Sequence, residues 1–404
     1  MELGISSAVE EIVARSTAFL EQEVLPVEAR YQAEKADVGP WDTPPVIEEL
    51  KAKARESGLW NLFLPGDRGA GLTNLEYAHI AEVTGRSPWI MPEALNCMAP
   101  DTGNMEILAH FATKPVQDTW LRPLLDGTLR SVYSMTEPAV ASSDANNIAC
   151  SITEDGDGFR VNGHKWWSSG AMSPRCKVAI VMGLSAPDGV RHQRHSMVVV
   201  PLDTPGVNRL RSTSVFGFSD SGHGGHAEIV YDDVWVPRDN LLGDLHGGFA
   251  IAQARLGPGR IHHAMRLIGM AERAFDLMAA RACERHPFGK AVAEQGVFQD
   301  WLARARIKIE MVRLLVLKTA WLMDTVGNRG AAVEIAAIKV AAPEMATWVI
   351  DRAIQTHGGA GVSQDTPLAE LYAQARMLQI ADGPDEVHLM TLARHELKRY
   401  QQKV

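Results

Sequence analysis

The hydrophobic positions along the chain change their period twice. Apolar residues recur at helical spacing from Ser7 to Arg30, where Ser7 and Glu10 have the form of a capping box. Near Tyr133 the period changes to that of strands, and after Gly247 the helical period returns. The chain therefore predicts helices, then strands, then long helices. This order excludes a βαβ dinucleotide-binding fold, in which strand and helix alternate.

The middle of the chain predicts several short strands. An apolar alternation at 148–152 leads into a turn at 155–158, and β-rich runs follow at 178–182, 197–200, 226–231 and 234–236. Beyond them, two long amphipathic stripes predict helices at 267–278 and 302–323. A third helix is expected at 331–350, and Pro343 should kink or divide it. Long amphipathic helices near the C-terminus indicate a bundle with faces left over for self-association.

Composition excludes some classes of partner. The 404 residues carry a formal charge of −9, which argues against nucleic acid because backbone binding needs clustered Lys and Arg. Four widely spaced cysteines indicate reduced, mostly buried thiols. The start of the chain lacks a signal-peptide pattern, and no stretch approaches the roughly 20 apolar residues of a membrane helix. We therefore expect a cytoplasmic protein without membrane insertion.

Two segments of the chain could carry chemistry. The first, 133–144, reads Y-S-M-T-E-P-A-V-A-S-S-D, a hydroxyl-rich loop that could cradle a flat cofactor or simply form a turn. The second, 162–171, sets Trp166 and Trp167 beside two serines, which offers a stacking face with hydrogen-bond donors. The alternative is a Trp pair in a β-core. The residues by themselves leave both choices open.

Other patterns carry less weight. The histidines His223, His226 and His246, and the pair His262-His263, lack adjacent thiols or carboxylates, so we expect no metal site. The glycines between 66 and 71 imitate a dinucleotide fingerprint without its βαβ context, which predicts a loop.

Taken together, the two segments resemble the acyl-CoA dehydrogenase family, whose flavin-facing segments read roughly T-E-P-G-A-G-S-D and N-G-x-K-x-W-x-T-N. Further along, 285–290 is similar to R-x-x-F-G-K and 355–361 to Q-x-x-G-G-x-G. The stretches R-L-G-P-G-R-I-H-H at 255–263 and A-D-G-P-D-E-V-H at 381–388 resemble the branch that contains human members ten and eleven and their bacterial relatives. The order of matches covers nearly the whole chain.

The resemblance implies an α+β fold with an N-terminal α-helical domain (1–132), a middle β-domain (133–246) and a C-terminal four-helix bundle (247–404). It implies an FAD-dependent dehydrogenase that forms the α,β double bond of an acyl-CoA in fatty acid β-oxidation. Electron-transferring flavoprotein is the implied electron acceptor. A homodimer or homotetramer is the implied assembly.

The resemblance also implies site residues. Those expected to bind FAD are Met135, Thr136, Trp167, Ser169, Arg285, Phe288, Gln295, Gln355, Gly358 and Gly359. Of these, Arg285 and Phe288 would reach the FAD of a neighbouring subunit. Those expected to contact the acyl-CoA are Ser142, Arg260 and Gly383. An extra serine in the 133–144 loop leaves the assignment of Ser142 open.

Asp382 is the implied catalytic base. Many family members have Glu in a Y-E-G-T sequence where this chain has Asp382 between Ala381 and Gly383. Taken alone, an Asp before Gly-Pro is more often a turn former. An alternative base position around 256–258 offers no carboxylate, and Asp385 and Glu386 lie past the aligned position. The shorter side chain suggests either a closer backbone or a 2-methyl-branched substrate.

Two other functions stay open. A flavin oxidase on the same scaffold, acting on acyl-CoA or on nitroalkanes, would use oxygen as its acceptor, and nitroalkane oxidases also use an Asp base. A non-catalytic helical scaffold protein would bind no flavin.

Overall fold

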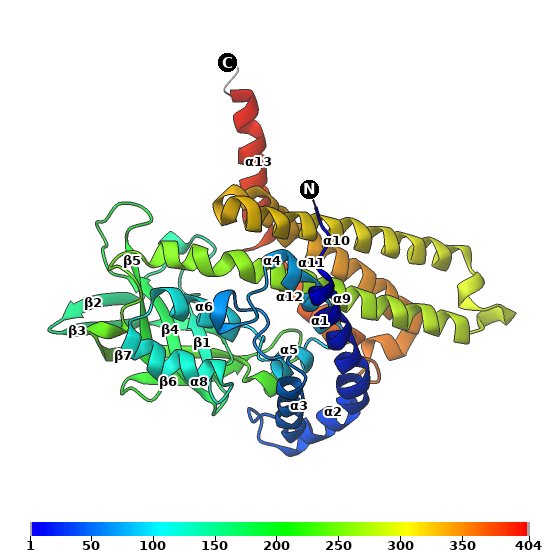
Figure 1. Ribbon diagram of the computed structural model, residues 1–404, viewed down its shortest axis with the longest axis horizontal. Helices are drawn as coiled ribbons and strands as arrows, with labels where there is room; N and C mark the ends of the chain where they lie inside the picture. Colours follow the sequence, from blue (N-terminus) through cyan, green and yellow to red (C-terminus); the bar gives the residue numbers. More distant parts are fainter. Residues whose placement is uncertain (1, 402–404) are drawn as a thin grey trace. The chain divides into compact units, whose positions relative to one another are not determined.

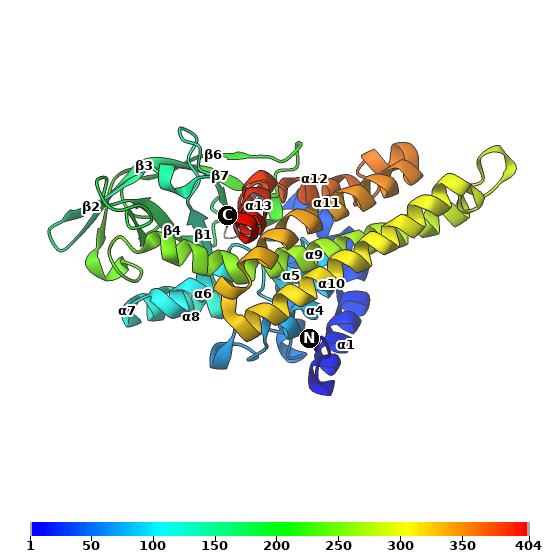
Figure 2. The same cartoon turned by 90° about the horizontal axis from the view of Figure 1, so that it is seen from above.

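The computed structural model describes residues 2–401, apart from the side chains of residues 67, 256–258 and 399. Within these residues the chain forms two compact units. Figures 1 and 2 draw its elements in colours that follow the residue number. One unit comprises residues 2–25, 72–91 and 260–401, and the other comprises 26–71 and 92–259. We describe each unit by itself.

The unit formed by 26–71 and 92–259 contains one seven-stranded sheet. Its strands are β1 (Arg130–Ser134), β2 (Ser151–Asp155), β3 (Gly158–Ser169), β4 (Cys176–Leu184), β5 (His195–Pro201), β6 (Val207–Thr213) and β7 (His226–Pro237). The order is β1-β4-β2-β3-β7-β6, with β5 paired to β4. β1 and β2 pair with β4 in parallel, and the remaining pairs are antiparallel. No α-helix lies between β1 and β7 in the described chain, so the exclusion of an alternating βαβ fold is confirmed.

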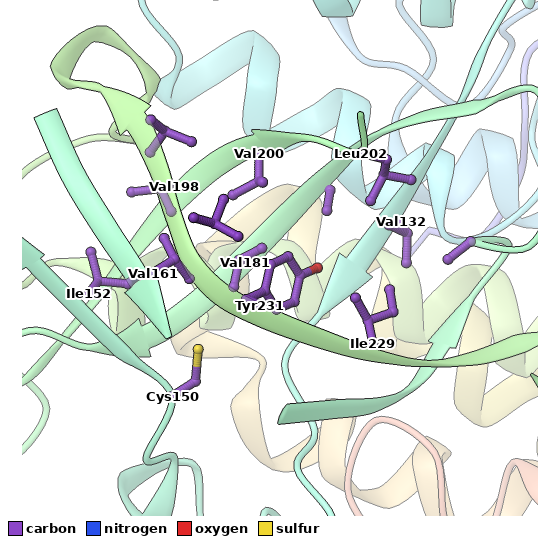
Figure 3. Close-up of a cluster of buried hydrophobic side chains, with 14 of the residues drawn as sticks. Val132, Cys150, Ile152, Val161, Val181, Val198, Val200, Leu202, Ile229 and Tyr231 are labelled. Atoms are coloured by element: carbon purple, nitrogen blue, oxygen red, sulfur yellow. The ribbon is translucent and has the colours of Figure 1, made fainter. Parts of the chain in front are cut away.

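The sheet is built around a core of β-branched and aromatic side chains. Figure 3 shows Val132 of β1, Val161 of β3, Val181 of β4, and Ile229 and Tyr231 of β7 gathered in one cluster. Branched and aromatic side chains suit a pleated, buried surface. Two of the free cysteines lie in this core and a third is also buried, whereas Cys283 is exposed.

Short helices complete this unit: α2 (Glu28–Asp37), α3 (Pro45–Glu56), α6 (Asp101–Phe111), α7 (Lys114–Val116) and α8 (Arg122–Leu125). The one-turn helix α5 (Met91–Ala94) begins at the boundary between the two units.

The other unit is helical. It contains α1 (Ser7–Phe19), α4 (Asn74–Gly85), α9 (Gly248–Glu284) from Arg260 onward, α10 (Gly296–Gly330), α11 (Ala332–His357), α12 (Leu368–Met377) and α13 (Asp385–Gln401). α11 packs against α10, α12 and α13, and α4 packs against α1 and α10. The predicted order of helices, strands and long helices is confirmed. No helix of the described chain combines the length and apolar character needed to span a bilayer.

Local details differ from the sequence-based expectations. The N-cap of α1 is Ser6 rather than Ser7, because Ser6 has extended backbone and its hydroxyl accepts the N–H of Val9. The helix expected to reach Arg30 is interrupted by a π turn at Leu20–Val24 and a 3-10 turn at Leu25–Val27. A proline at position 26 has no N–H to continue the ladder there.

Two other elements are longer than expected. The strands predicted at 226–231 and 234–236 form the single strand β7. Pro343 does not divide α11, whose residues around it are buried. Burying the apolar side chains of this segment is favourable, and this free energy offsets the loss of the backbone hydrogen bond that a proline removes from a helix interior.

Candidate active site

A buried ion pair fixes the loop that follows β1. Lys165 of β3 is fully buried, and its Nζ donates to the carbonyl oxygens of Met135 at 2.8 Å and Met182 at 2.7 Å. It also pairs with Glu137 at 2.8 Å, and Glu137 accepts the backbone N–H of Cys150 at 2.8 Å. Buried charges are tolerated when paired and hydrogen-bonded in this way. Sequence reasoning quoted both charged residues within its motifs but assigned them no role.

The two tryptophans form an irregularity in β3. The pairing register with β7 shifts between Lys165 and Ser168, and Trp167 has a left-handed backbone with φ of 53°. The Trp167 side chain is 37% exposed, while the backbone N–H of Trp166 donates to the carbonyl of Thr136 at 3.0 Å. This irregularity joins the strand to the loop and leaves one indole accessible, as bulges beside functional sites do.

Ser169 ends β3 beside a buried histidine. Its Oγ lies 2.9 Å from Nδ1 of His226, and the two residues are register partners. The His226 ring is also 5.4 Å from that of Trp167. Burial lowers the pKa of His226; Asp220 raises it and His223 lowers it further. Asp220 in turn bonds His223 at 2.8 Å.

Ser142 is occupied within its own loop. Its Oγ accepts the N–H of Glu137 at 2.9 Å and lies 3.2 Å from the Glu137 carbonyl. These contacts hold the loop in a compact turn. The contact of Ser142 with acyl-CoA stays a prediction.

In the helical unit, the connection between α9 and α10 meets the end of α11. Arg285 donates from Nη1 to the carbonyl of Thr356 at 3.2 Å. Gly358 has φ of 65°, and a Cβ there would lie 3.3 Å from the same Nη1. Gly359 has open space at its Cβ position, and Gln355 is exposed. The structure therefore brings Arg285 together with the glycine turn, where backbone groups are accessible.

The tip of that connection presents an aromatic ring. Phe288 is fully exposed and has a left-handed backbone with φ of 55°. Gln295 is the half-buried residue before α10, and its carbonyl accepts the N–H of Phe298 at 3.0 Å. An exposed Phe in strained backbone needs an explanation beyond the folding of its own unit.

Asp382 lies in the turn between α12 and α13. Its backbone is left-handed, with φ of 57°, and Gly383 follows with φ of 98°. The Asp382 carbonyl accepts hydrogen bonds from Arg260 Nη2 at 3.4 Å and from His388 Nε2 at 3.2 Å. Its Oδ2 lies 3.7 Å from His263 Nε2, and the carboxylate is one quarter exposed. The turn thus holds the backbone firmly and leaves the carboxylate accessible.

Positive groups surround this turn. Burial lowers the pKa of Arg260, and Asp382 raises it; the buried Nε of Arg260 has no partner within the described chain. Burial, assisted by Arg260 and Lys339, also lowers the pKa of His388 to about 4. His388 is therefore neutral near pH 7 and donates its Nε2–H to the Asp382 carbonyl.

The neighbouring carboxylates have other environments. Asp385 begins α13 and lies 3.8 Å from Lys339; burial raises its pKa. Glu386 is exposed. The alternative base position at 256–258 lies outside the described side chains. Across the described part of the chain, no group of three His, Cys, Asp or Glu side chains could hold a metal ion.

Comparisons with known proteins cover nearly the whole chain. Family models described as the N-terminal, middle and C-terminal domains of acyl-CoA dehydrogenase match residues 6–128, 132–234 and 246–397. A probable acyl-CoA dehydrogenase of Mycobacterium tuberculosis is 56% identical over 99% of this chain and 98% of its own length. Acyl-CoA dehydrogenase family member 10 of Mus musculus is 52% identical over 98% of this chain, which spans only 37% of that relative's length.

A solved structure is also similar. A putative acyl-CoA dehydrogenase from Mycobacterium abscessus has a TM-score of 0.95 and 49% identity, and the match covers 98% of this chain and 100% of that one.

Proposed function

This chain belongs to the acyl-CoA dehydrogenase family, and on that premise we propose that it converts an acyl-CoA thioester to its trans-2-enoyl-CoA with Asp382 as the base. The observation that carries the proposal is the turn around Asp382. Its backbone is held by Arg260 and His388 while its carboxylate stays accessible. A base must be positioned before it can remove a proton efficiently.

The residues of the sheet unit fit the isoalloxazine of FAD. Trp167 offers a flat, accessible face. Ser169 follows in the same strand, and the backbone hydrogen bond from Trp166 to Thr136 connects this strand to the loop that carries the Thr136 hydroxyl. Trp166 Nε1 is a buried donor that lacks a partner within the described residues, which suits a polar ligand. When bound, FAD would supply the acceptor for the β-hydride.

The helical unit fits the rest of the cofactor. Arg285 beside the Gly358 turn combines a guanidinium with accessible backbone, which suits a diphosphate. Phe288, Gln295, Gln355 and Gly359 are proposed to complete this FAD-binding region. We propose that this region binds the FAD of a neighbouring subunit, and that the exposed Phe288 ring contacts that FAD.

Asp382 performs the proton step in this proposal. Its carboxylate removes the α-proton of the thioester, and its backbone N–H donates to the thioester carbonyl and stabilises enolate character. Gly383 and Arg260 shape the same turn, and Ser142 is proposed to contact the acyl-CoA. Asp is shorter than Glu by about 1.5 Å, a difference of the size that can change a rate about a hundredfold. We propose that either the turn approaches the substrate closely or the substrate carries a 2-methyl branch.

Four further properties belong to the same proposal. We propose electron-transferring flavoprotein as electron acceptor, a role in β-oxidation, a homodimer or homotetramer, and a cytoplasmic location. We also keep the three domains 1–132, 133–246 and 247–404 as a proposed division.

Anaerobic reduction by acyl-CoA tests the base. Asp382→Asn should slow the loss of flavin absorbance near 450 nm by about 10² to 10⁴-fold, because an amide cannot take the α-proton. Asp385→Asn, at the first residue of α13, is the matched control and should react at the normal rate. Normal reduction of Asp382→Asn, or its loss in Asp385→Asn, contradicts the assignment. A panel of isobutyryl-, 2-methylbutyryl- and straight-chain acyl-CoAs tests whether the substrate carries a 2-methyl branch. A preference for straight-chain acyl-CoAs would exclude the branched substrate.

The same samples distinguish the other functions. Rapid reoxidation in air with peroxide release would identify an oxidase. A protein with no bound-flavin absorbance near 450 nm after FAD is added and the excess removed would identify a non-catalytic scaffold.

A further inference from the structure

A histidine that the proposed reaction does not use lies directly behind Ser169. His226 begins β7 opposite the end of β3, and its Nδ1 is 2.9 Å from Ser169 Oγ. Its side chain is buried, and its ring lies 5.4 Å from the accessible Trp167 ring. The contact is a full hydrogen bond between two side chains on paired strands.

The surroundings keep this imidazole neutral. Burial lowers the pKa of His226, and the charged groups that act on it are Asp220, which raises the pKa, and His223, which lowers it. Asp220 bonds His223 directly at 2.8 Å, and the charge of Lys35 helps to lower the pKa of Asp220. The carboxylate is therefore engaged with His223 rather than His226. A neutral imidazole has one N–H and one bare nitrogen.

The Ser169 hydroxyl must complement whichever form His226 takes. If Nδ1 carries the proton, it donates to Ser169 Oγ, and the serine proton is free for an acceptor elsewhere. If Nε2 carries the proton, Nδ1 accepts the serine proton, and Ser169 can then only accept from another donor. One proton moving between the two ring nitrogens converts one arrangement into the other, with no change in charge.

We propose that His226 is a positioning residue that sets whether the Ser169 hydroxyl donates or accepts on the face it shares with Trp167. This inference rests on the proposed function, in which that face carries the isoalloxazine. The N5 atom of an oxidised isoalloxazine accepts a hydrogen bond, whereas the reduced ring has an N5–H that donates. With a neutral imidazole beside it, Ser169 can donate to the oxidised isoalloxazine and accept from the reduced one. An apolar side chain in place of His226 would fix neither orientation of the serine hydroxyl.

Nitrogen-15 NMR of the FAD-loaded protein, with labelled histidine, tests the proposal directly. The His226 signals are assigned by their loss in His226→Asn. In the oxidised protein Nδ1 should be protonated, and after chemical reduction by dithionite the proton should reside on Nε2. Ser169→Ala should abolish this dependence on redox state. His164→Asn, a histidine on β3 paired with Glu228, is the matched control and should preserve it.

A second measurement separates positioning from mere folding. His226→Asn retains an amide that can donate or accept at the place of Nδ1, and should bind FAD nearly as tightly as wild type. His226→Leu should bind FAD about 3- to 10-fold more weakly, the scale of one hydrogen bond. Equal affinity of these two variants contradicts the proposal.

The outcomes distinguish this inference from the proposed function. The same His226 tautomer in both redox states overturns the inference, yet acyl-CoA can still reduce the flavin in an Asp382-dependent way. Because dithionite sets the redox state, an inactive enzyme still reports the tautomer. Failure to bind FAD would overturn both.

Discussion

At the scale of single residues, three of the ten non-glycine residues with left-handed backbone in the described chain belong to the proposed site. Trp167, Phe288 and Asp382 have φ of 53°, 55° and 57°. For residues with a Cβ this region costs on the order of 1 kcal/mol, least for Asp and most for bulky side chains. Such strain persists where the surrounding structure fixes it, and it concentrates at functional positions. The motifs that singled out Trp167 and Phe288 carry no information on φ, whereas Asp382 stands before Gly-Pro, a pattern typical of turns.

Glu106 of α6 provides a residue-scale prediction about pH. Burial raises the pKa of its carboxyl to about 7, although Arg255 opposes the shift. In the unfolded chain the ordinary value is 4.5, so between these two values the unfolded state releases a proton that the folded state retains. Stability is therefore lost as the pH rises through this window.

Glu106→Gln removes that loss. The apoprotein variant should be more stable than wild type by about 2 to 3 kcal/mol at pH 8, and nearly equal to it at pH 4. Urea unfolding at the two pH values measures the difference. A gain of the same size at both would mean that packing rather than ionisation limits this site.

At the scale of elements, a guanidinium cluster joins three helices of the helical unit. Arg313 of α10 bonds Glu82 of α4 at 2.8 Å and also pairs with Glu272 of α9. Glu272 has a pKa below its ordinary value, because hydrogen bonds from Arg306 and Arg313 outweigh its burial. A partly buried charge network of this kind stabilises the arrangement of helices only while every member is paired.

Arg313→Met should therefore be costly. We expect a loss of about 2 to 3 kcal/mol, because Glu82 and Glu272 would face each other without their shared partner. Arg304→Met, which breaks an exposed pair with Asp300 on the same helix, should cost less than about 0.5 kcal/mol. Chemical denaturation of both variants supplies the comparison, and similar losses would contradict the cluster's importance.

Periodicity predicted the elements of the fold better than their ends. The apolar stripes of α9, α10 and α11 identify long helices because burial and period coincide over many residues. The cap at Ser6 could not be distinguished from Ser7, since both are serines and only the backbone dihedral decides. The β3 irregularity at Trp167 depends on pairing with β7, which is distant in sequence.

The candidate site shows the same limit. Motifs identified Asp382 and Trp167, but no local pattern places His226 against Ser169 or His263 beside Asp382. Those contacts arise from strand register and helix packing. The paired charges of Glu137 and Lys165, by contrast, left a sequence signal, because Glu137 and Lys165 stand in the two segments that the sequence already singled out together.

At the scale of the whole molecule, α10 carries exposed apolar residues on one face. Ile307, Met311 and Leu314 are 57%, 65% and 56% exposed and recur at helical spacing. Contiguous apolar surface of this kind typically marks a protein interface. A second copy of the chain is the occupant that the proposed homo-oligomer requires.

Met311→Glu should weaken that assembly. A charge in an apolar interface must be desolvated without a partner, so the native mass should fall toward that of the monomer. Light scattering after gel filtration measures the mass. Val190→Glu, at an exposed apolar residue outside this face, is the control and should leave the mass unchanged. An unchanged mass for Met311→Glu would exclude this face as the interface.

The interleaving of the two units has a consequence for synthesis on the ribosome. The sheet unit ends at residue 259, whereas the helical unit needs segments from both ends of the chain. Helices α1 and α4 therefore emerge early and must wait for α10, with which α4 packs, to be translated. At about 5 to 20 residues per second this delay lasts on the order of 10 seconds or more. During this delay the apolar faces of α1 and α4 are exposed, and we expect a chaperone to bind them.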